Sequence, residues 1–535
     1  MIWLLRDIDL LSVLARAATL SFEALLLGGV AYLLFVARAV RAGAVVQAFC
    51  RRGIRMAAAA LVCGETITVS ASCVVLMSGS DFTLRGLATT GFFLAGSSAV
   101  LCSVALWILA RSGRPWAIRA LLPVSLLLLG AAVATSHSIA RIDHRVLLAL
   151  LTAAHHLGTA AWIGAMPFLL ISLKHAESVE EARRMARRYS RMALLSAALL
   201  VLAGSGLAWV YVGSWNGLYG TTYGVLLVAK IYLLLVLAAL GVGNWFLVRR
   251  LDRDPEPLLL RLRRVAEAEI GLGFIAVLAA ASLTAQPPAV DVAAPDRLSP
   301  QEIYARMHPE SPRMSTPPAS ALAPATSMQV AIRDSQFKPM AASDANDRAW
   351  SEYNHHWAGL IVLAAGLLAF LSRFQRMRWA RFWPLSFAGL AVFIVLRADP
   401  ENWPIGPRPF WESFSAPDVL QHRFAAILIL VFAAFECAVQ AGKLRARWAA
   451  MIFPAMCVIG AAVLLTHDHV VKDVKEELLA EMSHTPIALF GVTAGWGRWL
   501  ELRAPRSRLA TLAGYLWPLC LAIVGLILLN YREIS

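Results

Sequence analysis

Apolar runs of about 18 or more residues recur along nearly the whole of this 535-residue sequence. A helix that rises ~1.5 Å per residue needs roughly 20 apolar residues to cross a hydrocarbon core about 30 Å thick. The hydrophobic content of 59%, with 16% charged residues, also lies outside the range of soluble proteins. The sequence therefore predicts an all-α polytopic protein of the lipid bilayer. Its transmembrane helices, about fourteen in number, are expected near 10–37, 54–79, 88–110, 117–136, 146–173, 190–213, 223–249, 265–286, 355–372, 381–396, 420–441, 446–466, 484–500 and 508–530.

The first apolar run does not read as a cleavable signal peptide. A signal peptide opens with positively charged residues, whereas Asp7 and Asp9 stand in that position here. The apolar stretch is also longer than the core of a signal peptide. We therefore expect this segment to stay in the protein as a transmembrane helix.

Basic residues gather in every second predicted loop. The formal net charge is +15, which in a soluble protein would suggest binding to nucleic acid. Here, however, basic clusters such as 38–55, 183–191 and 249–264 follow alternate predicted helices. Short loops that are rich in Lys and Arg face the cytoplasm. We therefore predict a multi-pass protein with both termini on the outer face and with no nucleic-acid partner.

A polar stretch rich in Pro and Ala separates two groups of predicted helices. Residues 287–352 contain no sustained apolar run, and their composition favours extended or disordered chain. The alternation of basic loops puts this linker on the outer face. We therefore expect an N-terminal membrane domain, 1–286, of about eight helices and a C-terminal membrane domain, 353–535, of about six.

Two kinds of motif are missing from the sequence. The seven cysteines show no CxxC spacing, so they predict neither a zinc site nor a disulfide framework. The sequence also lacks the GxxxxGK[ST] run that binds nucleotide phosphates in many ATPases. Active pumping by this chain alone is therefore not expected, and we predict that it is not an enzyme.

Most of the twelve histidines lie near the predicted outer ends of helices. Imidazole nitrogens bind copper and zinc well, and the run from Thr466 to His469 supplies two of them at one helix end. If several helix ends converge, they form a metal site on the outer face. Ordinary amphipathic histidines at helix ends are the alternative, which the spacing alone does not exclude. The candidate ligands at this face are His137, His355, His356, His422, His467, His469 and His484.

A few ionisable residues are expected deep inside the apolar segments. Such side chains are costly in a membrane and therefore mark candidate functional sites. His155 and His156 lie ~15 Å below the outer end of their helix and point about 100° apart, so the two rings face different neighbours. Glu23, Glu65 and Lys230 lie inside three other predicted helices. These residues form either a structural Glu and Lys pair or, together with the histidines, a path for ions or protons.

Several segments of the chain resemble a known family. In the first half, HHLGTAAWIG at 155–164, LVAK at 227–230 and SLTAQPP at 282–288 are similar to the core of the copper resistance D (CopD) family, which would span about 145–290. The second half resembles the C-terminal membrane extension of long CopD-type proteins. The matching segments there are WSEYNHHWAG at 350–359, LLTHDH at 464–469, VKEELL at 474–479, SHTP at 483–486 and GWGRWLEL at 495–502.

The resemblance implies a protein of copper homeostasis or copper resistance in the bacterial cell inner membrane, with the outer face in the periplasm. Members of the family are thought to move copper across the membrane or to receive it from periplasmic carrier proteins. We therefore predict a permease for copper ions that enter from the periplasm. Its outer histidines would bind the copper ion and feed a path past His155, in which His156, Glu23, Glu65 and Lys230 take part.

Two other functions fit the same residues. Histidines on facing transmembrane helices can ligate haem b, so His155 with a second deep histidine would give an electron-transfer protein. A Soret band in the purified protein would indicate that function. Alternatively, an assembly factor could hold copper for another membrane protein without transporting it. Only a measurement of copper flux separates that function from a permease.

Overall fold

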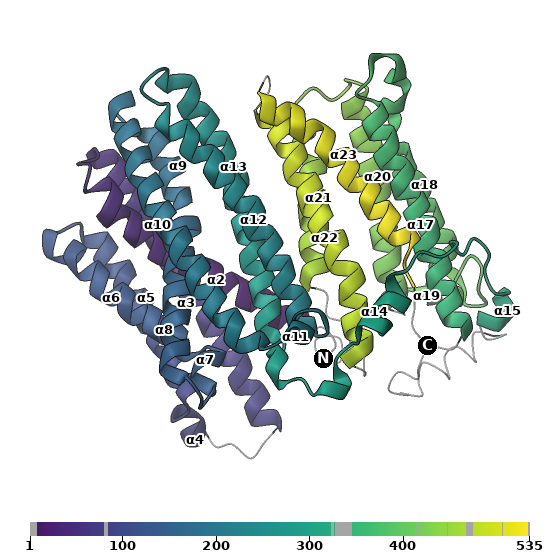
Figure 1. Cartoon of the computed structure of the whole chain (residues 1–535), viewed down its shortest axis with the longest axis horizontal. Coiled ribbons are helices and arrows are strands. Elements are labelled where there is room, and N and C mark those ends of the chain that lie inside the picture. Colours follow the sequence, from purple (N-terminus) through teal and green to yellow (C-terminus); the bar gives the residue numbers. More distant parts are fainter. Residues whose placement is uncertain are drawn as a thin grey trace. The chain divides into compact units, whose positions relative to one another are not determined.

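The computed structural model describes residues 8–79, 84–322, 326, 345–414, 417–446, 448–466, 474–504 and 507–532. Within these ranges the chain is built of helices and contains no β-strand (Figure 1). The predicted all-α class is therefore confirmed. The chain divides into two compact units, Met1–Leu218 with Leu226–Ala293 and Tyr219–Val225 with Ala294–Ser535.

Long helices joined by short connections form the first unit. The short elements between them are α4 (Leu84–Ala88), α7 (His137–Ala140), α11 (Trp215–Tyr219) and η3 (Ala289–Asp291). The long helices are α2 (Ile8–Tyr32) with the π-helix η1 (Leu33–Ala37), α3 (Ala44–Gly79), α5 (Gly91–Ser112), α6 (Pro115–Ala134), α8 (Arg145–Thr159) with the π-helix η2 (Ala160–Gly164) and α9 (Met166–His175), α10 (Val179–Val212), α12 (Thr222–Arg249) and α13 (Pro255–Ala285).

The second unit contains a further set of long helices. Its short elements are η4 (Ala294–Asp296), α14 (Pro300–Met307), α15 (Ala319–Leu322), η5 (Gln375–Phe382), α19 (Phe410–Ser413) and η6 (Ala449–Met451). The longer helices are α17 (Ala345–Leu371), α18 (Leu385–Arg397), α20 (Pro417–Gln440), α21 (Ile452–Thr466), α22 (Val474–Arg503) and α23 (Arg508–Leu529).

In the described part of the chain, 12 helical stretches are long and apolar enough to cross a membrane. The predicted multi-pass membrane protein is therefore confirmed. The predicted spans 446–466 and 484–500 are also helical, but the apolar stretch Ala449–Leu465 is shorter. Polar residues near His484 interrupt the apolar stretch of α22. The count of about fourteen spans and the side of each terminus stay predictions.

Some helices begin earlier than their apolar runs predict. The helix expected over 190–213 starts at Val179, because Ser178 caps it by accepting a hydrogen bond from the backbone N–H of Glu181. Its basic first turns are helical rather than loop, and Arg183 donates to Asp252 at 2.8 Å. Hydropathy marks only the part of a helix that lies in hydrocarbon, so it misses such polar ends.

Close backbone packing positions α2 against the kinked helix α8–η2–α9. A Cβ atom built on Gly28 would lie 2.3 Å from the carbonyl oxygen of Ala160, and one on Gly164 would lie 1.9 Å from that of Ala24. Only glycine fits at these two positions, as is common where membrane helices pack closely. This contact brings the middle of α2 beside the polar end of α8.

The core of the second unit is aromatic. The rings of Trp383, Phe453 and Trp517 contact one another, with centroid separations of 5.0, 5.6 and 5.3 Å. All three side chains are almost fully buried. Edge-on aromatic contacts of this kind stabilise a packed core beyond the area that they bury.

The described part of the linker contains short helices instead of the extended chain that its composition favours. Ser299 and Glu302 form a capping box at the start of α14, so the sequence carries a local signal for the start of this helix. The Nζ atom of Lys475 in α22 lies 2.8 Å from Oε1 of Glu302. Local capping and this ion pair give the linker its structure despite its many prolines.

Candidate functional site

A largely buried polar contact of the first unit joins α2 to α8. Oε1 of Glu23 lies 2.9 Å from Nδ1 of His156, and the two side chains are 9% and 18% exposed. The contact arises because α2 packs against α3, α8 and η2. The first and second predicted helices are therefore neighbours, and the fifth contacts the first. The His156 ring makes no other hydrogen bond to the described residues, so its Nε2 atom is available to bind a metal ion.

Two further charges lie close to this pair. Glu65 of α3 interacts electrostatically with both Arg16 and Glu23. Arg16 lies two turns before Glu23 on α2, and the sequence analysis did not select it. A charged residue so near the start of an apolar run is ordinarily interpreted as part of the polar end of a helix. Hydropathy therefore could not predict that Arg16 interacts with Glu65.

The ring of His155 faces another part of the first unit. A Cβ atom built on Gly204 of α10 would lie 3.4 Å from Nδ1 of His155, so the ring packs against a glycine. Among the described residues, this buried nitrogen has no hydrogen-bond partner. Lys230 of α12 is the charge that acts on it most strongly. Within the described chain, Lys230 forms no ion pair with Glu23 or Glu65, so the Glu and Lys pair considered above is not formed there.

Three of the predicted outer histidines gather around Tyr531 in the second unit. The ring of His355 stacks on the Tyr531 ring at 3.8 Å, and the ring of His484 meets it edge-on at 6.2 Å. His356 reaches the backbone of the same residue, with Nε2 2.8 Å from the carbonyl oxygen. Helices α17, α22 and α23 therefore do bring histidines from separate segments to one place.

Both ring nitrogens of His356 are used within the protein. The backbone N–H of Arg313 donates to Nδ1 at 2.7 Å, so the proton of the neutral ring is on Nε2 and is donated to Tyr531. The residue is 5% exposed. In this arrangement His356 offers no lone pair to a metal and instead holds the linker against the end of α23.

Of the remaining outer candidates, the structure describes the side chain of His422 alone. His422 lies 2.8 Å from Oδ1 of Asp399 and is 47% exposed. His467 and His469 lie outside the described residues, and so does the side chain of His137. Among the described residues, no group of three or more His, Cys, Asp or Glu side chains is arranged to hold a metal ion.

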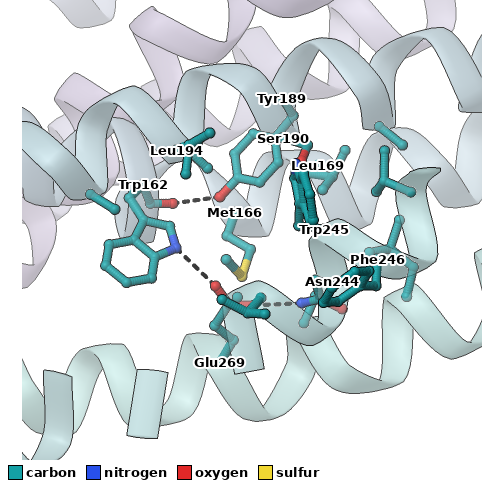
Figure 2. A pocket seen from close by; sticks show the side chains of 18 of the residues that line it. Trp162, Met166, Leu169, Tyr189, Ser190, Leu194, Asn244, Trp245, Phe246 and Glu269 are labelled. Atoms are coloured by element: carbon teal, nitrogen blue, oxygen red, sulfur yellow. Dashed lines mark hydrogen bonds between the residues drawn. The ribbon is translucent and has the colours of Figure 1, made fainter. Parts of the chain in front are cut away.

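A buried carboxylate that the sequence analysis did not select lies in α13 (Figure 2). Glu269 is 1% exposed, and its Oε1 accepts a hydrogen bond from Nε1–H of Trp162 at 2.8 Å. Its Oε2 accepts from Nδ2–H of Asn244 at 2.5 Å. The hydroxyl of Tyr189 donates to the carbonyl oxygen of Trp162 at 2.6 Å. Because Glu269 falls within the predicted span 265–286, the depth criterion that selected Glu23 could also have found it.

Residues 183–283 match the family model described as copper resistance protein D (CopD). The match assigns this segment of 101 residues to the CopD family. The match confirms the resemblance over a narrower range than 145–290, and it supports a role in copper resistance. It includes Asn244 and Glu269 but begins after His155 and His156. No curated protein and no solved structure matches the chain.

Proposed function

We propose that this protein moves copper ions across the membrane through its first unit, from the predicted periplasmic face to the cytoplasm. The observation that carries the proposal is the buried pair of Glu23 and His156 inside membrane-spanning helices. Polar side chains at such positions are costly and are kept where ions or protons pass. The membership of the CopD family makes copper the expected ion.

The pair has the chemistry of a supported metal ligand. A histidine that binds a metal usually has its other ring nitrogen hydrogen-bonded to a carboxylate, which holds the ring and raises its basicity. Here Glu23 holds Nδ1 of His156 at 2.9 Å, which leaves Nε2 for the ion. Imidazole nitrogen is a good ligand for copper, whether the ion is bound stably or only transiently during transport.

The carboxylate beside His156 is opposite in sign to the charged group near His155, and this difference decides which histidine a copper ion would approach. Glu65 interacts electrostatically with the carboxylate of Glu23 and with the guanidinium of Arg16. The ring of His155 is instead close to the ammonium group of Lys230. A copper cation is therefore attracted toward His156 and repelled from His155. We place the path past His156 rather than past His155.

The outer histidines are proposed as a separate capture site for copper. His355 and His484 lie against the ring of Tyr531. In the sequence, His467 and His469 directly follow the predicted span 446–466 and precede His484. A site of this kind could receive copper from a periplasmic carrier protein. His356 is left out of the proposed ligand set because its nitrogens are both bonded.

Copper uptake into proteoliposomes tests the proposed transport. Vesicles that contain the purified protein should accumulate copper faster than protein-free vesicles and faster than vesicles that contain an unrelated membrane protein. Binding of copper without accumulation inside the vesicles would favour the assembly factor and would contradict the permease.

A further inference from the structure

A cavity of about 370 Å³ lies beside Glu269 in the first unit. Its walls come from η2, α9, α10, α12 and α13, as Figure 2 shows for the side chains around it. Most of the lining is apolar, and its polar residues include Glu269 and Asn244, which are hydrogen-bonded to each other. Cavities that bind small molecules are generally about 300 to 1,000 Å³, largely apolar, and carry a few placed polar groups.

The carboxylate in this cavity has no cation beside it. Glu269 accepts two N–H hydrogen bonds but, among the described residues, forms no ion pair with Lys, Arg or His. Burial of a charged group without a counter-charge costs free energy. A cation within the cavity would remove this cost, and the described residues that line the cavity include no Lys, Arg or His.

A second acceptor lies next to the carboxylate. Oδ1 of Asn244 is buried and has no hydrogen-bond partner in the described chain. Asn244 lines the cavity, and its Nδ2–H group donates a hydrogen bond to Glu269. A ligand that occupies this end of the cavity therefore has to donate hydrogen bonds rather than accept them.

Aromatic rings form much of the remaining wall. Trp162, Tyr189, Trp245 and Phe246 all line the cavity. The face of such a ring attracts a cation, and several rings with a carboxylate are the usual recognition elements for ammonium groups. The ring of Trp245 already carries one such contact, from the guanidinium of Arg249 at 4.6 Å.

We propose that this cavity binds an organic ammonium ion, a primary amine with an apolar body. The N–H donors of the ammonium group reach Glu269 and Oδ1 of Asn244, and the apolar body lies against the aromatic wall. A bare metal ion would leave most of the apolar volume unfilled. The site is distinct from the pair of Glu23 and His156, so it does not depend on the transport of copper.

Binding of radiolabelled phenylbutylamine to the purified full-length protein in detergent tests the proposal. We expect saturable binding that unlabelled phenylbutylamine displaces and that phenylbutanol, which has the same body with a neutral head, displaces at least tenfold more weakly. The substitution Glu269→Gln should weaken binding tenfold or more. The matched variant Glu267→Gln, which changes the same charge on the same helix away from the cavity lining, should bind within threefold of wild type.

Gly241 provides a second test that leaves Glu269 in place. A Cβ atom there would lie 3.5 Å from Oε1 of Glu269 and 3.6 Å from the ring of Trp162, which are ordinary contact distances. Gly241→Ala should therefore fold and bind phenylbutylamine, whereas Gly241→Leu fills the cavity and should bind it at least tenfold more weakly. Equal displacement by amine and alcohol, or wild-type affinity in a folded Gly241→Leu protein, would overturn the proposal.

Discussion

Glu23 and His156 are 133 residues apart in the sequence, yet Oε1 of Glu23 lies 2.9 Å from Nδ1 of His156. The contact joins α2 to α8 at a point where both side chains are largely buried. A ring held in this way presents Nε2 in a fixed direction. Glu65 interacts electrostatically with Glu23 and with Arg16, so further charged groups lie near this pair.

The substitution Glu23→Gln tests whether the carboxylate supports His156 as a ligand. Glutamine keeps the size of the side chain but loses its charge, so the ring is held less firmly and is less basic. Loss of such a supporting group usually costs about 10- to 100-fold in metal affinity or activity, and we expect copper uptake to fall by that factor. A folded Glu23→Gln protein with uptake within twofold of wild type would show that the carboxylate has no such role.

Replacing His467 and His469 together with Ala tests the proposed capture site. Copper binding in detergent should weaken tenfold or more, which corresponds to about 1.4 kcal/mol. Imidazole binds a metal only when it is neutral, so the affinity of the wild-type protein should also fall below about pH 6.5. Unchanged binding in a folded double variant would mean that these are ordinary residues of a helix end.

His356→Ala is the contrasting variant for that experiment. Because His356 bonds the backbone N–H of Arg313 and the buried carbonyl oxygen of Tyr531, its loss removes one partner from each. An unpaired buried group costs about 1–3 kcal/mol, so the melting temperature should drop while the copper affinity of the folded fraction stays the same. A selective loss of copper affinity would instead make His356 a ligand.

Acid should weaken the contact between α14 of the linker and α22, which the ion pair of Glu302 and Lys475 forms. The hydrogen bond from Lys475, with those from Ser299, lowers the pKa of Glu302 from 4.5 to about 2. A carboxyl with a lowered pKa stabilises the folded state above its unfolded value, and the contribution is lost as the pH falls through the folded value. Wild type and Glu302→Gln should therefore differ by a constant amount in melting temperature above about pH 5, and the difference should shrink toward about pH 2. A difference that grows in acid would contradict this attachment.

Reporter fusions test the predicted topology at sites that the helix bounds leave free. Fusions in 38–43, 176–178 and 372–374 should report the cytoplasm, and fusions in 309–318 should report the periplasm. The expectation rests on the basic residues near these connections. A periplasmic signal from 176–178 would reverse the side to which the histidines are assigned.

The apolar runs were sufficient to predict the helices of the membrane, and the rule on intramembrane charges was sufficient to select Glu23, Glu65 and Lys230. The partners of these residues could not be predicted in the same way. His156 meets Glu23 because α2 and η2 touch through Gly28 and Gly164, and this packing depends on residues distant in the sequence. The interaction of Arg16 with Glu65 could not be predicted for the same reason, because it joins two different helices.

The outer histidines show a different limit of sequence analysis. Spacing placed His355 and His356 side by side at a helix end, but it carried no information on which ring nitrogen is already bonded. In the structure His355 stacks on Tyr531, whereas His356 uses both nitrogens within the protein. Two adjacent histidines of equal promise in the sequence therefore make different contacts in the structure.

Copper uptake by His156→Ala proteoliposomes tests the central claim most directly, with His155→Ala as the matched variant at the neighbouring position. The proposed path predicts uptake at the level of protein-free vesicles for His156→Ala, uptake within about threefold of wild type for His155→Ala, and copper binding at the outer face retained in both, because separate sites behave independently. Wild-type uptake by a well-folded His156→Ala protein would contradict the account.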